Sequence, residues 1–511
     1  MSLFIKKPIA GLLKEVATSE TGLKRTLGAG NLIALGIGAI IGAGLFVRTA
    51  AAAANNAGPS VTLGFVVAAV GCAFAGLCYA EFASMIPIAG SAYTYSYATM
   101  GEFIAWIIGW DLVLEYAVGA ATVSIAWSEY LNKLLEIFGM RVPYEWSHSP
   151  FESLKDVHGQ VLSHGMMNLP ALFIIIVLSL LLIRGTKESA FVNGLIVITK
   201  VAIVILVIIL GWSYMNPINH ANYIPPAGSY TDTQGVTHNY GGILGILGAA
   251  GVVFFAFIGF DAVSTAAQEA KNPKKDMPIG ILGSLAVCTV LYILFAHVLT
   301  GIASVDDFRH AGKEASVTYA IKTYMHGYGW LANLVTVAIL AGFSSVILVM
   351  LMGQSRVFYS MSRDGLVPKI FSDVHPKFRT PYKSNLIFLV VVGLFSAFVP
   401  GDIVGDMTSI GTLFAFILVC AGVMILRKTN PEIKRQFKTP LVPLVPILGI
   451  IVCGAMIFGL GWTNWARLIV WLLIGFVIYF GYSRRHSRLR NPHKYPLPPA
   501  DIPADIPTYK P

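Results

Sequence analysis

Residues 36–46 read GIGAIIGAGLF, an apolar run interrupted by glycines, and residues 248–261 read GAAGVVFFAFIGFD. Such segments at corresponding positions of two halves of a chain are the best sequence indication of an inverted-repeat transporter site. One glycine-rich helix alone is more simply explained by close helix packing. Two of them, five predicted helices apart, favour the transporter interpretation and place helices 1–5 and 6–10 in two repeats.

The composition indicates an integral membrane protein. Only 12% of the 511 residues are charged, against ~25% in a soluble domain, and 56% are hydrophobic with a mean hydropathy of +0.70. So few charges cannot cover a water-exposed surface. Soluble enzymes, secreted disulfide scaffolds and nucleic-acid binders are therefore excluded as classes.

The fold class predicted from the apolar runs is an all-α membrane protein with twelve transmembrane helices. Each run approaches the ~20 residues that cross a bilayer as a helix. The predicted spans are 31–54, 59–85, 101–135, 165–183, 188–212, 241–269, 279–304, 328–360, 384–400, 404–427, 441–461 and 465–483.

The distribution of positive charge predicts the orientation. If the N-terminus is cytoplasmic, 27 of the 36 lysines and arginines lie inside and 8 outside, with Lys200 within a span. Cytoplasmic loops carry such an excess, so both termini are expected to be cytoplasmic, and a tail after Arg484 to be disordered. The expected organisation is an N-terminal amphipathic segment (1–30), repeat one (31–212), an extracellular loop (213–240), repeat two (241–427), helices 11 and 12 (441–483) and a cytoplasmic tail (484–511).

The broken helices suggest a specific ligand chemistry. Unwound backbone within a membrane must line a cavity or be buried in protein. The N–H groups that begin a half-helix attract a carboxylate, and the freed carbonyls can receive an ammonium group. A zwitterionic amino acid presents both groups side by side.

Several motifs carry a family resemblance. Besides the two glycine-interrupted strings, they are PIAGSAY at 87–93, GW…LEY within 109–116, E…NP…P within 269–278, and GQSR…MSRDG within 353–365. In this order they resemble the amino acid–polyamine–organocation superfamily, and within it the cationic amino acid transporter family and its bacterial members. The similarity covers about residues 20–485. It implies the five-plus-five inverted-repeat fold of the leucine transporter, two further C-terminal helices, and alternating access.

The same resemblance implies where a substrate binds. Its carboxylate would meet backbone N–H groups in the first broken helix, its ammonium group would meet carbonyls of both breaks, and an aromatic side chain would close over it. On this sequence the resemblance places the carboxylate at Ala43 and Gly44, with Gly42 also among the binding residues. The carbonyls would be near Ile40, Phe255 and Ile258, and Phe255 would be the aromatic gate.

Ionisable residues inside the spans are further functional candidates, because charge at mid-membrane depth is costly. Glu115 lies one turn after Asp111 and aligns with the family's side-chain pocket. It would pair with a basic substrate or relay protons; the alternative is a structural hydrogen bond between helices. Asp261 would relay protons or accept backbone N–H groups at the second break. His297 is expected to be a satisfied core histidine.

Lys200 lies in the middle of the fifth predicted helix. In some ion-independent relatives with this fold, a lysine from helix 5 occupies the place where sodium bridges helices 1 and 8 in sodium-coupled relatives. By this resemblance Lys200 would act as a titratable substitute for sodium, near Gly38 and near Ser344 or Ser345. Snorkelling toward an interface is the alternative.

Met350 bears on substrate choice. The resemblance places a small residue near this position in mammalian members, so its bulk would favour small or neutral side chains over arginine if it lines the pocket. Simple helix packing is the other interpretation of this methionine.

The predicted function is a proton-coupled symporter that imports small neutral or cationic L-amino acids across the cell membrane. The alternative is an obligate exchanger of amino acids or polyamines. No HExxH or GxSxG string indicates an enzyme, and no catalytic residue, metal or cofactor is expected. The expected partners are the L-amino acid, protons and the lipid bilayer, with no nucleic acid. A monomer is expected, and an accessory subunit is left open.

Overall fold

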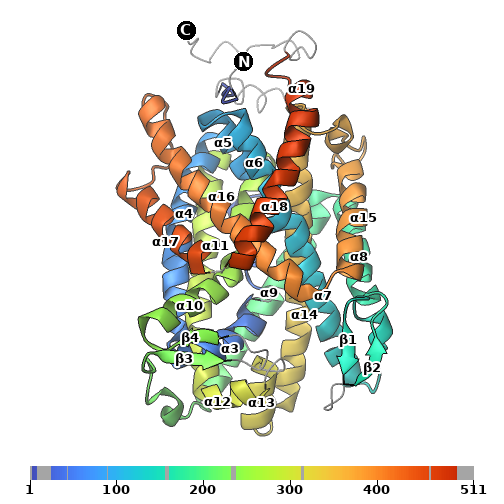
Figure 1. Cartoon of the computed structure of the whole chain (residues 1–511), viewed down its shortest axis with the longest axis vertical. Helices are drawn as coiled ribbons and strands as arrows, with labels where there is room; N and C mark the ends of the chain where they lie inside the picture. The colour runs from blue at the N-terminus through green and yellow to red at the C-terminus, as the bar shows by residue number, and fades with distance from the viewer. Residues whose placement is uncertain are drawn as a thin grey trace.

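The computed structural model describes residues 3–8, 25–42, 44–88, 90–155, 160–231, 237–311, 316–459 and 462–491. It is an elongated bundle of helices with both termini at one end (Figure 1). The α-helices are α2 (Ala29–Ile40), α3 (Thr49–Ala52), α4 (Val61–Met85), α5 (Ser91–Thr99), α6 (Glu102–Val113), α7 (Gly119–Glu136), α8 (Leu169–Arg184), α9 (Thr186–Trp212), α10 (Gly242–Phe254), α11 (Pro273–Ile302), α12 (Val305–Ala311), α13 (Val317–Tyr324), α14 (Gly329–Arg363), α15 (Tyr382–Phe398), α16 (Gly401–Thr429), α17 (Leu444–Gly459), α18 (Trp462–Ile478) and α19 (Arg484–His486).

The described residues include eight helices that are long and apolar enough to cross a membrane, and four shorter apolar helices. The all-α membrane fold expected from the composition is confirmed. The shorter helices are α2, α8, α15 and α17, and α2 is short because its span is interrupted.

Both glycine-interrupted spans are discontinuous. In the first, α2 ends at Ile40 and the chain resumes as the π-helix η2 (Gly44–Arg48) before α3. In the second, α10 gives way to the 3-10 turn η8 (Phe255–Phe257), and the chain continues from Asp261 to Glu269 as the 3-10 helix η9. Between η8 and η9, Gly259 has a φ of +112°, which residues with a side chain rarely adopt.

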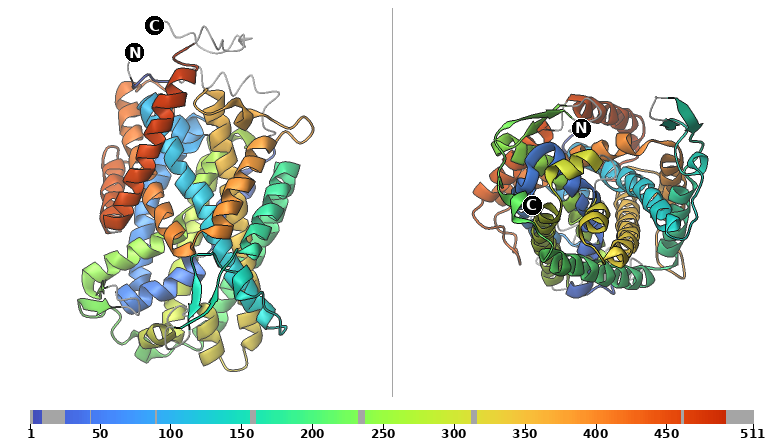
Figure 2. Two further views of the ribbon diagram at one scale, coloured as in Figure 1. Left: turned by 45° about the vertical axis from the view of Figure 1, so that its right-hand side comes forward. Right: turned by 90° about the horizontal axis from the view of Figure 1, so that it is seen from below.

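The end opposite the termini carries the short elements (Figure 1). Two antiparallel hairpins lie there, β1 (Ser153–Lys155) with β2 (Val161–His164), and β3 (Gly228–Thr231) with β4 (Thr237–Tyr240). Helices α12 and α13 are at the same end, which the right-hand view of Figure 2 shows from below. α18 runs along the outside of the bundle (Figure 2).

The end that carries the termini is held by buried ion pairs. Arg356 Nη2 lies 2.6 Å from Glu269 Oε1, and Arg427 Nη2 lies 2.7 Å from Glu81 Oε2. Arg490 Nε lies 2.5 Å from Glu102 Oε1. Arg427 is partly exposed, and the other charged groups of these pairs are removed from water. All of them are also hydrogen-bonded, which is the condition under which buried pairs are tolerated.

The expectation of a disordered tail after Arg484 is wrong for residues 484–491. These residues continue from α18 through α19, and Arg490 is buried against Glu102 together with the Tyr479 and Ser487 hydroxyls. Glu102 is the first residue of α6, almost four hundred residues before Arg490. No pattern in the sequence near Arg490 therefore indicates this partner. Most of the predicted N-terminal amphipathic segment lies outside the described residues. Its part 3–8 is not helical, and Lys7 N–H donates to the Tyr97 carbonyl.

Candidate functional site

The two broken helices touch directly where they lose regular α-helical structure. A Cβ added to Gly44 would overlap the backbone of Ala256 in η8, and a Cβ on Gly259 would lie 2.7 Å from the Ala39 Cβ. The glycines thus let the two interrupted segments meet backbone to backbone. At this crossing, peptide groups outside a regular α-helix are presented by both segments side by side.

Tyr292 of α11 joins the two breaks. Its hydroxyl lies 2.8 Å from the Ile40 carbonyl oxygen and 2.9 Å from the Ala256 carbonyl oxygen, and its side chain is fully buried. One hydroxyl hydrogen donates to one of these carbonyls at a time. Sequence reasoning missed this residue, because its only signal was a tyrosine in the middle of an apolar span.

The residues implied for substrate binding converge at this crossing. Ile40, Gly42, Gly44 and Ile258 are buried. Phe255 is partly exposed, and the Arg48 guanidinium lies 5.5 Å from the centre of its ring. Ala43 lies outside the described residues.

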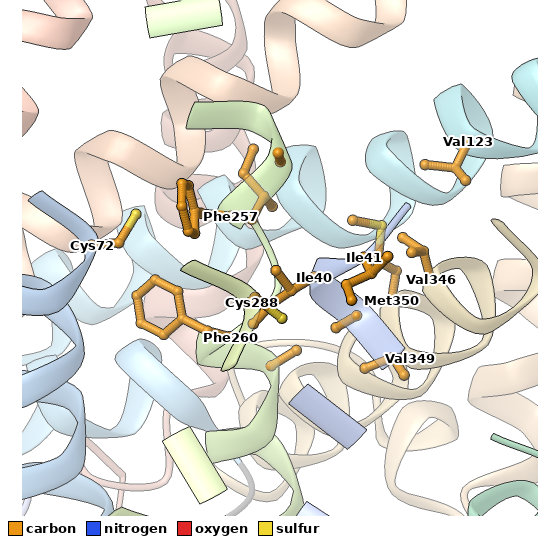
Figure 3. Close-up of a cluster of buried hydrophobic side chains, with 14 of the residues drawn as sticks. Ile40, Ile41, Cys72, Val123, Phe257, Phe260, Cys288, Val346, Val349 and Met350 are labelled. Atoms are coloured by element: carbon orange, nitrogen blue, oxygen red, sulfur yellow. The ribbon is translucent and has the colours of Figure 1, made fainter. Parts of the chain in front are cut away.

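Apolar side chains surround the crossing (Figure 3), with Ile41, Val123, Val346 and Met350 pointing toward one another from α7, α14 and the first break. A Cβ on Gly42 would lie 2.6 Å from Val346 Cγ2, and one on Gly119 would lie 3.1 Å from the Met350 sulfur. Met350 therefore fills the space between the broken helix and α7. This contact agrees with helix packing, one of the two interpretations of Met350, and its lining of a substrate pocket stays a prediction.

Lys200 reaches the freed carbonyls at the end of α2. Its Nζ donates to the Gly38 oxygen at 2.9 Å and to the Ile41 oxygen at 2.7 Å. The side chain is fully buried, and its stem passes Gly342 of α14. The amine thus points into the protein, and it does not snorkel toward an interface.

The eighth predicted span corresponds to α14. Of the two serines considered there, Ser344 and Ser345, it is Ser345 that faces Lys200. Its hydroxyl lies 2.9 Å from the Gly38 oxygen, which Lys200 also binds, and 2.6 Å from Asn193 Oδ1. Ser344 is turned away, bonded to the Leu340 carbonyl and to Trp127. Asn193 was not recognised from the sequence.

Three carboxyl groups are buried near the second break: Asp111, Glu115 and Asp261. The Tyr116 hydroxyl donates to Asp261 Oδ2 at 2.6 Å. Glu115 belongs to the π-helix η5 (Leu114–Val118), a feature often found at functional sites.

These carboxyl groups have few partners. Among the described residues, no hydrogen bond of ordinary geometry reaches the oxygens of Asp111 or Glu115, although Asp261 neighbours Glu115. The ion pairs found in the described part of the chain involve none of the three.

No group of three histidine, cysteine, aspartate or glutamate side chains within the described ranges is placed to hold a metal ion.

His297, predicted to be a core histidine, has its Nδ1 3.2 Å from the Tyr223 hydroxyl.

Comparison with known proteins identifies the family. Residues 27–485 match the amino acid permease family over almost the whole bundle. The chain belongs to this family. The permease is 45% identical to the branched-chain amino acid permease BcaP of Bacillus subtilis, over 96% of this chain and 99% of that protein. It is 39% identical to the methylthioribose transporter of the same organism, over 96% and 100%.

A more distant relative is the chloroplastic cationic amino acid transporter 9 of Arabidopsis thaliana, 35% identical over 90% of this chain and 76% of that protein. The permease is therefore a multi-pass membrane transporter of the amino acid–polyamine–organocation superfamily, with an amino acid as substrate, and not an enzyme. The resemblance deduced from the motifs is confirmed.

Proposed function

We propose that this permease imports L-amino acids into the cell by symport with protons, through alternating access of the crossing between its two broken helices. The observation that carries the proposal is the position of the Lys200 amine. It donates hydrogen bonds to two carbonyl oxygens at the first break, where the helix is interrupted. A fixed amine can gain and lose a proton in place, whereas a bound metal cation would have to enter and leave. The repeats would be residues 31–212 and 241–427, with the termini on the cytoplasmic side of the cell membrane.

The substrate would bind across the crossing. The Gly44 N–H group begins the outer half-helix, where partial positive charge favours a carboxylate, and Ala43 precedes it in the sequence. The carbonyls of Ile40, Phe255 and Ile258 would receive the ammonium group. Tyr292 shares the Ile40 carbonyl, so its hydroxyl would have to turn fully to Ala256 when the ammonium group arrives.

Protonation of Lys200 would set how firmly α2 is attached to α9. As an ammonium group, Lys200 donates charge-assisted hydrogen bonds to Gly38 and Ile41, which are stronger than those of a neutral amine. Loss of the proton would weaken the attachment at the point where the helix is already interrupted. The free-energy difference between the two arrangements would then depend on the proton, which is what coupling requires.

The lining of the crossing favours neutral aliphatic substrates over cationic ones. Val123, Val346 and Met350 would offer apolar contacts to a substrate side chain beside the first break, and the bulk of Met350 would disfavour an extended guanidinium side chain. The name of the B. subtilis branched-chain permease agrees with such a choice. The relatives differ in the substrates for which they are named, so the side chains at the crossing support this choice more directly than overall similarity does.

Uptake by the purified permease in liposomes tests the function. With leucine and alanine outside and empty vesicles, an imposed inward proton gradient should drive accumulation, and an inward sodium gradient at constant pH should not. Accumulation that requires internal amino acid would establish the obligate exchanger instead. Equal uptake with sodium and with proton gradients would refute the role of Lys200 as the built-in cation.

Glu115→Gln is expected to reduce proton-driven uptake of alanine about tenfold, within the usual range of coupling effects between sites. The amide keeps the shape of the side chain but cannot take up or release a carboxyl proton. Initial rates at several external pH values measure the effect. Glu136→Gln is the matched control, because Glu136 ends the following helix and pairs with Arg141 on the exposed surface. Unchanged alanine and arginine transport with an unchanged pH dependence would remove Glu115 from the site.

A further inference from the structure

Arg48 lies on the side of the crossing that faces away from the termini. It is the last residue of η2, four residues after Gly44, whose backbone meets Ala256 at the crossing. The chain then runs through α3 to Asn56, whose carbonyl accepts from the Gly241 N–H directly after β4. The β3–β4 hairpin belongs to the end opposite the termini (Figure 1). Arg48 therefore lies between the crossing and that end.

The Arg48 guanidinium lies against the ring that is predicted to close over the substrate. Its Cζ is 5.5 Å from the centre of the Phe255 ring, within the distance at which a cation is attracted to an aromatic face. Both side chains are partly exposed. Phe255 begins η8 and directly precedes Ala256 at the crossing. The positive charge is thus held one side chain away from the peptide groups of the crossing.

Within the described residues, no carboxylate forms an ion pair with Arg48. Asp261 lies beyond the second break, on the segment that leads from Phe255 to Glu269. The Glu269 carbonyl accepts from the Leu27 N–H just before α2, so this segment runs toward the end that carries the termini. The charge of Arg48 on the opposite side of the crossing is therefore left without a neighbour of opposite sign.

We propose that Arg48 is a specificity-determining residue that excludes amino acids with a cationic side chain from the crossing. The inference rests on the proposed binding of the substrate at the crossing, and it narrows the substrate class to amino acids of zero net charge. Such a substrate presents its carboxylate to the partial positive charge of η2, and the guanidinium adds to that attraction.

Lysine and arginine substrates carry a second positive charge in the side chain. Close to the protein, where charges are less screened than in bulk water, the guanidinium would repel that charge. A repulsion that acts on one class of substrate and not on the other produces specificity without any added contact to the favoured class. The bulk of Met350 would act in the same direction through size, whereas Arg48 acts through charge.

The test measures how well two amino acids of equal length displace labelled leucine from the detergent-solubilised permease. One is lysine, and the other is its neutral ε-hydroxy analogue, so the ratio of their affinities reports the charge alone. We expect the wild type to bind lysine more weakly than the analogue. In Arg48→Met, which keeps an unbranched stem over Phe255 but removes the charge, we expect this ratio to shift about tenfold in favour of lysine.

Two control variants separate charge from structure. Arg48→Lys keeps the positive charge without the planar guanidinium, and we expect it to retain the wild-type ratio. Arg141→Met removes an exposed arginine that pairs with Glu136 in the loop after α7, and we expect no change in the ratio. A displaced Phe255 would weaken both competitors together and leave their ratio unaltered.

Three outcomes would overturn the proposal. The first is equal binding of lysine and its analogue by the wild type, and the second is an unchanged ratio in Arg48→Met. The third is loss of leucine binding in both Arg48→Met and Arg48→Lys, which would assign Arg48 a structural role.

The same binding assay distinguishes this proposal from the function on which it rests. Binding in detergent needs no ion gradient, so a failure of proton coupling would leave the comparison intact. If Gly44→Ala binds leucine as the wild type does, the substrate does not lie at the crossing and the proposed site is refuted. If Gly44→Ala loses leucine binding while Arg48→Met leaves the ratio unchanged, only the role of Arg48 is refuted.

Discussion

Lys200→Met is expected to abolish proton-driven amino acid uptake while substrate binding persists. Methionine retains the unbranched stem that passes Gly342 but has no proton to carry and no donor for the two carbonyls of the first break. Gly38 keeps a hydrogen bond from Ser345, so the main unsatisfied group is the Ile41 carbonyl. A buried carbonyl without a hydrogen bond costs about 1–3 kcal/mol of the free energy of unfolding. We expect the variant to remain folded, because the rest of its large core is unchanged.

Three measurements check the Lys200 prediction: uptake under an imposed pH gradient, binding of leucine to the detergent-solubilised protein, and thermal unfolding. Lys322→Met is the matched control, since Lys322 lies at the exposed end of α13. Uptake in Lys200→Met that still responds to the pH gradient would contradict the coupling mechanism. Loss of binding together with loss of fold would instead assign Lys200 a structural role.

Gly44→Ala is the second substitution with a large expected effect. The added methyl group would overlap the backbone of Ala256, so neither a rotamer change nor a side-chain shift can relieve the contact. The two broken segments would have to move apart, and overpacking of this kind costs about 1–3 kcal/mol. The separation would also displace the N–H and carbonyl groups proposed to bind the substrate, so leucine uptake is expected to be lost.

Gly251→Ala provides the comparison for Gly44→Ala. Gly251 lies in the glycine-rich helix α10 of the other broken span. A Cβ added there would have no neighbouring atom within 4 Å outside its own helix turn. In a helix, alanine is favoured over glycine by about 1 kcal/mol, so this variant should unfold at a slightly higher temperature and transport normally. Normal uptake in Gly44→Ala would show that the contact between the breaks is not needed.

The sequence was sufficient to predict where the helices break, because two apolar spans carry runs of glycine at corresponding positions. It also identified Lys200, Glu115 and Asp261, because a charge in such a span is conspicuous. It did not reveal Tyr292, Asn193 or Ser345 as partners of the breaks. Their polar groups are uncharged, and comparable residues occur in many spans without any such contact. Only the packing of α9, α11 and α14 around α2 selects them.

The tail is where the sequence misled most clearly. A basic, proline-rich ending is typical of disorder, and yet Arg490 is buried against Glu102. A pairing between residues almost four hundred positions apart has no local signature. Most of the predicted N-terminal amphipathic segment and the end of the tail lie outside the described residues, so the structure bears only on residues 3–8, 25–30 and 484–491 there.

The Glu102–Arg490 pair has a consequence for biosynthesis. Glu102 opens the third predicted span and enters the membrane early, whereas Arg490 leaves the ribosome almost four hundred residues later, because chains are made from the N-terminus. Until then, this carboxylate lacks the cation that accompanies it in the finished bundle. Nascent chains that stop short of residue 490 would therefore leave Glu102 without its arginine partner. This unpaired carboxylate would distinguish an incomplete chain from a complete bundle for the cell's quality-control machinery.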